Sequence, residues 1–203
     1  MTVEKTEIRE NIEWTNMCWN DAPDNCKARI LLVGDSIVVG HERLLHEIIK
    51  DEYCIDSFAT AKCVSDVDYM RELDYMLASK NYDLVIFNNG LHGFDISDEA
   101  YEESLQETLV DLNKRVKKLA WRTSTPIRQK ENLNQFETEK TPRIIRRNAF
   151  AAKVAQELNI PVLNLYTPMA ENVDYFSPDA VHYNEEGRET QAKMIAEFIK
   201  EII

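Results

Sequence analysis

Short apolar runs alternate with longer amphipathic segments from Arg29 onward. Residues 30–33 are continuously apolar and end at Gly34, which is the pattern of a strand buried on both faces. Similar runs predict further strands at 53–58, 82–87, 119–123 and 161–165. The run at 82–87 is the clearest central strand.

Helical patterns separate these runs. Leucines and other apolar residues recur at steps of three and four over 98–118, as in a helix that covers a sheet. Further helices are expected from Ile37 onward, near 66–79, at 142–158 and at 185–203. Five alternations of strand and helix predict a five-stranded parallel sheet with helices on both faces and a site beyond the carboxyl ends of the strands. The polar segment 127–141 is expected to be a loop that overhangs this edge.

The first 28 residues follow a different pattern. They are polar, with Trp14 and Trp19 as the only large apolar anchors, and predict an N-terminal arm (1–28) packed on a single domain (29–203). The charged N-terminus lacks the apolar core of a signal peptide, and no apolar run is long enough to span a bilayer. The four cysteines have no CxxC spacing, so we expect free thiols and a cytoplasmic protein.

The charge balance narrows the choice of partners. A formal net charge of −12 disfavours nucleic acids and acidic membranes, because both carry negative charge. A small neutral or cationic substrate fits better. His41 and His46 have no partners at metal-binding spacing, so we interpret them as surface residues and expect neither a metal nor an organic cofactor.

Ser36 is the first candidate for chemistry. It follows Gly34 and Asp35 at the end of the first predicted strand and at the start of a helix. The free backbone N–H groups of a helix start can stabilise a developing oxyanion. The alternative is that Ser36 only caps the helix, and its position alone does not separate the two interpretations.

Asp179 and His182 lie in the loop before the last helix. A histidine can take the proton of a serine hydroxyl, and a carboxylate can orient that histidine. The spacing Asp-x-x-His is weak evidence alone, because a turn aspartate beside a surface histidine gives the same pattern. The order along the chain strengthens it, since Ser36 and this pair are both expected at the carboxyl edge.

A third polar group, which runs from Asn88 to Gly93, follows the strand at 82–87. The glycines permit close backbone approach, and the polar side chains of Asn89 and His92 can donate to a substrate oxygen. A plain Asn-Gly turn is the alternative.

Together, these motifs resemble the SGNH/GDSL hydrolases. Gly34-Asp35-Ser36 looks like their first block and Asp179-x-x-His182 like their last, over most of the chain from Arg29 onward. The resemblance implies a three-layer α/β/α, flavodoxin-like fold and a Ser-His-Asp esterase mechanism through an acyl-enzyme, with Asp35, Gly90, Asn89 and His92 around the oxyanion and substrate. It also implies a small-molecule or carbohydrate ester as substrate, and we prefer acetyl esters.

Two departures from the family's pattern leave alternatives open. His92 stands where the third block usually has asparagine, and residues 61–65 contain no glycine for the second block. A weakened module that binds a glycan or another ligand is one alternative, and an acyltransferase with the same residues is another. A nucleotide binder ranks third, because GDSIVVG is not a phosphate-binding glycine motif.

Overall fold

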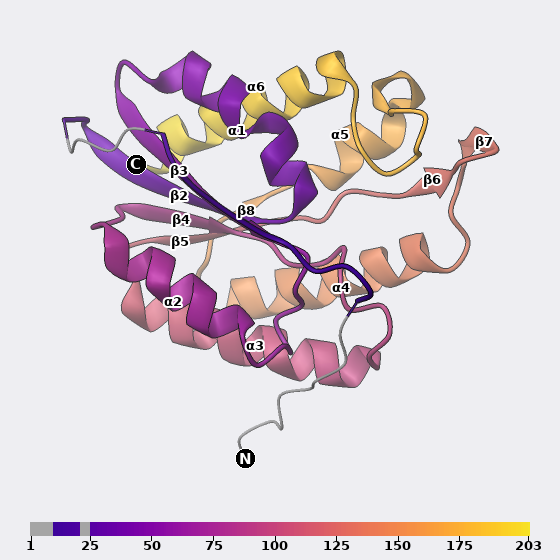
Figure 1. Ribbon diagram of the computed structural model, residues 1–203, viewed down its shortest axis with the longest axis horizontal. Helices are drawn as coiled ribbons and strands as arrows, with labels where there is room; N and C mark the ends of the chain where they lie inside the picture. The colour runs from indigo at the N-terminus through magenta and orange to yellow at the C-terminus, as the bar shows by residue number, and fades with distance from the viewer. Residues whose placement is uncertain (1–9, 21–24) are drawn as a thin grey trace.

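The computed structural model of the chain describes residues 10–20 and 25–203 and has a sheet between two layers of helices (Figure 1). Residues 1–9 and 21–24 of the predicted N-terminal arm lie outside the described residues. The sheet has six strands in the order β1-β3-β2-β4-β5-β8. Their bounds are β1 Thr15–Trp19, β2 Ala28–Gly34, β3 Tyr53–Thr60, β4 Leu84–Phe87, β5 Leu119–Arg122 and β8 Val162–Leu163.

Five of these strands are parallel and correspond to the five predicted ones. The predicted strand count was one too low, because β1 pairs antiparallel with β3 and forms one edge of the sheet. As an edge strand, β1 remains partly exposed and needs no continuous apolar run, so the pattern did not reveal it. The order of the parallel strands is that of a flavodoxin-like sheet, with its switch point between β2 and β4.

Helices cover both faces of the sheet, as the alternation predicts. One face carries α1 (Ser36–Ile49) and α6 (Glu185–Ile202), and the other carries α2 (Tyr69–Ser79), α3 (Asp98–Arg115) and α4 (Lys140–Glu157) (Figure 1). Two short elements that the sequence did not predict, α5 (Tyr166–Glu171) and a 3-10 turn (Val173–Tyr175), follow β8. Within the described ranges, no helix has the length and apolar character to cross a membrane.

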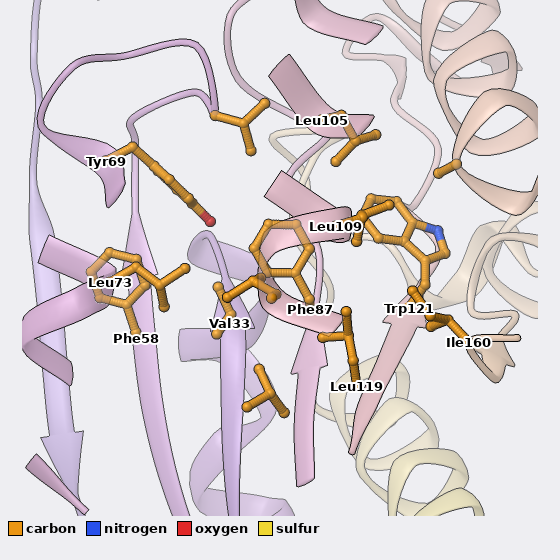
Figure 2. Packing of buried hydrophobic residues seen from close by; sticks show 14 of the residues in the cluster. Val33, Phe58, Tyr69, Leu73, Phe87, Leu105, Leu109, Leu119, Trp121 and Ile160 are labelled. Atoms are coloured by element: carbon orange, nitrogen blue, oxygen red, sulfur yellow. The ribbon is translucent and has the colours of Figure 1, made fainter. Parts of the chain in front are cut away.

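The central strands bury both faces. Leu31 and Val33 of β2 point into the cluster under α2, α3 and α4, whereas Ile30 and Leu32 point toward α1 and α6. Figure 2 shows the first cluster, in which Phe87 of β4 lies between aromatic neighbours from other elements. This burial on both sides explains why the strand sequences are continuously apolar rather than alternating.

The polar segment 127–141 contains a small antiparallel hairpin, β6 (Arg128–Gln129) and β7 (Asn132–Phe136), rather than loop alone. The hairpin lies at the carboxyl edge of the sheet, as expected. The Arg128 N–H donates at 2.9 Å to the carbonyl of Ala180, which lies in the loop before α6 at this edge. Arg128 itself is buried, and its guanidinium also donates to the carbonyl of Leu133 at 2.9 Å. Hydrogen bonds of Arg128 thus hold this hairpin, together with the packing of Leu133 against a small apolar cluster and of Arg128 on the Phe136 ring.

The expectation of free thiols is wrong for two cysteines. Cys26 and Cys54 form a disulfide with their Cα atoms 5.7 Å apart, while Cys18 and Cys63 are free. The pair meets because Ala28 of β2 lies opposite Tyr53 of β3, a contact that cysteine spacing does not reveal. The bond lies at the amino ends of these strands, away from the carboxyl edge.

Candidate active site

Ser36 is the first residue of α1, directly beyond the carboxyl end of β2. The capping alternative for Ser36 is wrong, because Asp35 is the N-cap: its Oδ1 accepts a hydrogen bond from the Ile37 N–H at 2.9 Å. The Ser36 hydroxyl is therefore available for other partners. Asp35 is only 1% exposed, which does not support its predicted role in substrate binding. Its hydrogen bond to the Ile37 N–H instead positions the turn.

The structure brings the three residues predicted for catalysis together. His182 Nε2 lies 2.8 Å from Ser36 Oγ, and His182 Nδ1 lies 2.7 Å from Asp179 Oδ2. The other oxygen, Asp179 Oδ1, accepts hydrogen bonds from the backbone N–H groups of Val181 and His182 at 3.0 and 2.9 Å. Hydroxyl, imidazole and carboxylate thus form one hydrogen-bonded series.

A tight turn holds Asp179 and His182 in place. Ala180 has φ of 68°, a left-handed conformation that costs a non-glycine residue roughly 1 kcal/mol. Its carbonyl accepts from Arg128 of the hairpin, and its N–H donates to the Ser177 carbonyl at 3.0 Å. The Ser177 N–H in turn donates to the His182 carbonyl at 2.8 Å. These bonds stabilise a strained turn at the candidate site.

Asp179 carries a negative charge at neutral pH. Partial burial alone would raise its pKa, but hydrogen bonds from the His182 ring and from two backbone N–H groups hold the pKa of this carboxyl below its usual value. An ionised Asp179 can only accept hydrogen bonds. His182 Nδ1 must therefore carry the proton, which leaves Nε2 of the neutral ring able to accept the Ser36 proton.

The loop after β4 approaches the chain closely at Gly90, as predicted. A Cβ at this position would lie 1.9 Å from Ser124 Oγ, so only glycine fits. Ser124 Oγ also accepts a hydrogen bond from Asn88 Nδ2 at 2.9 Å, which joins this loop to the end of β5. The alternative of a simple Asn-Gly turn does not account for these contacts.

Asn89 does not face the site. It is 2% exposed, its Oδ1 accepts from the Val64 N–H at 3.1 Å, and its Nδ2 donates to the Lys62 carbonyl at 2.8 Å. The prediction that Asn89 donates to substrate is therefore not supported by its contacts. Its side chain instead positions residues 61–65, the segment that corresponds to the second block.

His92 lies in the cavity into which Ser36 opens, and its side chain is 16% exposed. Its Nδ1 is 2.9 Å from a carboxylate oxygen of Glu10, a residue of the N-terminal segment. Sequence reasoning missed Glu10, because a charged residue in a polar arm gives no periodic signal.

Arg147 of α4 holds the loop that carries His92. This guanidinium is 1% exposed and donates to the carbonyls of Gly90 at 3.1 Å, His92 at 2.7 Å and Gly93 at 2.8 Å. It also stacks on the ring of Tyr101 at 3.8 Å. Sequence reasoning missed this residue as well, since arginine on an amphipathic helix is typical of a solvated face.

Asn148, also on α4, fixes the end of β5. Its Oδ1 accepts from the Ser124 N–H and its Nδ2 donates to the Ser124 carbonyl, both at 2.8 Å. Two hydrogen bonds to the backbone of Ser124 thus hold the Asn148 side chain against the end of β5. Because Ser124 contacts Gly90, this pair of bonds also supports the loop after β4.

The interpretation of His41 as a surface residue is also wrong. His41 is fully buried, and its Nδ1 lies 2.9 Å from Gln191 Oε1 of α6. Burial, with the nearby Arg122 charge, lowers the pKa of His41 to about 3. His46 is partly exposed, with a side chain 17% accessible to solvent. The two histidines of α1 thus lie in different environments.

Two cavities meet at Ser36, His182 and Trp14. One, of about 590 Å³, has a mixed lining in which Asn16, Asn184 and Arg188 contribute polar groups. The other, of about 710 Å³, is lined by Glu10, His92, Phe94 and Ile127, among others. No group of three or more potential ligands suitable for a metal occurs among the residues that the structure describes.

Several solved structures resemble the chain. A lipase/acylhydrolase from Enterococcus faecalis has a TM-score of 0.70 and 19% identity, over 86% of this chain and 96% of that one. A GDSL-like lipase from Bacteroides thetaiotaomicron has a TM-score of 0.67 and 18% identity, over 87% and 90%. An acetylxylan esterase from Geobacillus stearothermophilus has a TM-score of 0.68 and 14% identity, over 86% and 94%.

Comparisons of sequence give no such match: no family model and no curated protein matches the chain. The likeness to these solved structures is therefore one of fold, that is, of strand order and layers. This is the fold that the resemblance of the motifs implies. The chain has the fold of the SGNH/GDSL hydrolases.

Proposed function

We propose that the chain is a serine esterase that cleaves acyl esters through an acyl-enzyme. The observation that carries the proposal is the 2.8 Å contact between His182 Nε2 and Ser36 Oγ, on a ring that Asp179 holds at 2.7 Å. In this geometry His182 takes the Ser36 proton as Ser36 Oγ attacks the ester carbonyl. The same proton then passes to the departing alcohol, and a water molecule repeats the sequence to release the acid.

Backbone N–H groups support the second requirement, an oxyanion hole. Ser36 N–H stands at the start of α1, where helical N–H groups lack acceptors within the helix. In the segment 61–65, the N–H groups of Ala61, Lys62 and Val64 already donate to Trp14, Thr60 and Asn89. This leaves Cys63 and Ser65 as donors for the second position, and we propose that one of them replaces the missing glycine N–H.

The two cavities offer space on both sides of an ester carbonyl held at Ser36. Because both cavities include Ser36 and His182, an ester carbonyl at Ser36 can extend its acyl half into one and its alcohol half into the other. The amide and guanidinium groups of Asn16, Asn184 and Arg188 can hydrogen-bond hydroxyl groups. With the likeness to an acetylxylan esterase, this favours an acetyl ester on a carbohydrate as the substrate.

The cellular location stays a prediction. A cytoplasmic protein was expected from reduced cysteines, whereas a disulfide such as Cys26–Cys54 is typical of oxidising compartments. We therefore favour an oxidising compartment over the cytoplasm.

Active-site labelling with a fluorophosphonate probe tests the proposal. The wild type should gain one adduct on Ser36, located by mass spectrometry of the labelled peptide, and Ser36→Ala should gain none. Ser177→Ala is the matched control, because Ser177 lines one of the same cavities but makes no side-chain bond to His182. A folded wild type that does not react would contradict the esterase and favour the binding module. Ester cleavage with and without an added alcohol separates hydrolysis from acyl transfer.

A further inference from the structure

Glu10 and His92 form a second histidine–carboxylate pair beside the nucleophile. His92 Nδ1 lies 2.9 Å from Glu10 Oε1, much as His182 Nδ1 lies 2.7 Å from Asp179 Oδ2. Both rings and Ser36 line the cavity of about 710 Å³. Among the described residues, no hydrogen bond reaches Nε2 of His92.

The protonation of His92 Nδ1 follows from its partner. The hydrogen bond from His92 lowers the pKa of Glu10, more than burial raises it, so Glu10 is an anion at neutral pH. An ionised carboxylate accepts hydrogen bonds and cannot donate one, so the proton between the two residues belongs to His92 Nδ1. In a neutral His92, Nε2 would then carry a lone pair and would repel a developing oxyanion. Only the doubly protonated ring can donate from Nε2.

The charges around His92 favour this doubly protonated ring. Burial alone would lower the pKa of His92, but the hydrogen bond to Glu10 and the negative charge of Asp35 raise it above its usual value. Lys140 of α4 acts in the opposite direction with a smaller effect. Two further titratable or charged groups lie near His92: Arg147 of the same helix, which contacts its backbone carbonyl, and His182, which lines the same cavity. The ring shares its cavity with Ser36, the residue that directly follows Asp35.

We infer that Glu10 holds His92 as an imidazolium whose Nε2–H donates to the substrate carbonyl oxygen as that oxygen becomes negative. The inference rests on the proposed esterase function and assigns His92 as a catalytic residue and Glu10 as a positioning residue. When Ser36 Oγ bonds to the carbonyl carbon, the π electron pair moves to the carbonyl oxygen and the hydroxyl proton moves to His182. His92 keeps both of its protons, and its positive charge stabilises the new negative charge on the oxygen. A charged donor gives a stronger hydrogen bond than the neutral amide usual at this position.

The two histidines therefore have opposite requirements. His182 must be neutral to accept the Ser36 proton, and His92 must be charged to donate. As pH rises, deprotonation of His182 switches activity on and deprotonation of His92 switches it off. The profile of kcat/KM against pH should be bell-shaped, with its alkaline limb set by His92.

Kinetics of two variants test this assignment. His92→Asn introduces a donor that does not titrate, so its alkaline limb should disappear while the acid limb stays. Glu10→Gln removes the charge but can still accept from Nδ1, so the alkaline limb should move to lower pH by about one unit. Asp95→Asn is the matched control, because Asp95 lines the same cavity and the variant should leave the alkaline limb in place. An alkaline limb unchanged in His92→Asn would overturn the inference.

Nuclear magnetic resonance gives a readout that does not depend on activity. The imidazole ¹⁵N signals of His92, assigned by their loss in His92→Asn, should titrate at a lower pH in Glu10→Gln than in the wild type. Equal titration in the two proteins would overturn the pairing. If the titration shifts as expected but no ester is cleaved, the pairing stands and the proposed esterase, with the catalytic role of His92, fails.

Discussion

Asp179 binds His182 at two places: its Oδ2 accepts from the ring Nδ1 at 2.7 Å, and its Oδ1 accepts from the backbone N–H at 2.9 Å. The carboxylate thereby sets both the position of the residue and the tautomer of its ring. A variant that removes the charge of Asp179 but keeps its shape should therefore test the tautomer of the His182 ring separately from the position of the residue.

Asp179→Asn should keep the fold and lose most of the activity. The amide nitrogen of asparagine donates, so it favours the ring form with a proton on Nε2, which cannot accept from Ser36. We expect kcat/KM for an aryl acetate to fall on the order of 10³-fold or more, with nearly unchanged thermal unfolding. Asp174→Asn, a change in an exposed residue before the same turn, is the control. Activity within a few-fold of the wild type would contradict the assignment of Asp179.

Gly90→Ala should destabilise the protein and lower its activity. The new Cβ would lie 1.9 Å from Ser124 Oγ and 2.9 Å from Ser124 Cβ, so the loop before His92 must shift. Overpacking of this kind costs about 2 kcal/mol or more. Gly40→Ala is the matched control for stability, since its Cβ would meet nothing closer than Arg188 Cδ at 3.4 Å. Equal unfolding midpoints for the two variants in denaturant would contradict the close approach.

His41 should make the protein sensitive to acid. Its pKa is about 3 in the folded chain, against 6.5 for an ordinary histidine, so the unfolded state binds the proton first as pH falls. The contribution of neutral, buried His41 to the free energy of unfolding is fully present above about pH 6.5. It is lost progressively toward pH 3, at about 1.4 kcal/mol for each unit of pKa difference.

The comparison of His41→Gln with the wild type measures this contribution. The free energy of unfolding in urea should fall less between about pH 7 and pH 4.5 in the variant. His46→Gln, on the same helix but with a partly exposed side chain, should show the acid sensitivity of the wild type. The account of His41 fails if all three proteins lose the same free energy over this range.

The Cys26–Cys54 disulfide should contribute to stability and not to activity. It closes a segment with a sequence separation of 28, for which loss of chain entropy in the unfolded state predicts about 3–4 kcal/mol. Cys26→Ala/Cys54→Ala should therefore unfold at lower denaturant, and kcat/KM below the transition should be unchanged, because the bond lies at the amino ends of β2 and β3. Cys18→Ala is the control for loss of a thiol. Activity lost with full stability would contradict this separation.

The central strands and the Ser36, Asp179 and His182 positions were predictable, because they depend on local features. Continuous apolar runs reveal buried strands, and a site at the carboxyl edge follows from parallel pairing. Strand β1 and the Cys26–Cys54 bond were not predictable, since pairing with β3 decides both. Glu10 and Arg147 were missed for a related reason: a charged residue gains its role from partners far away in the sequence, here the loop of His92.

The central claim is that Ser36 is the nucleophile of an esterase, and the most direct measurement is hydrolysis of p-nitrophenyl acetate by the wild type, Ser36→Ala and Ser177→Ala. The account predicts turnover in the wild type and in Ser177→Ala, with a loss on the order of 10³-fold or more in Ser36→Ala. Equal rates in the wild type and in a folded Ser36→Ala would contradict it.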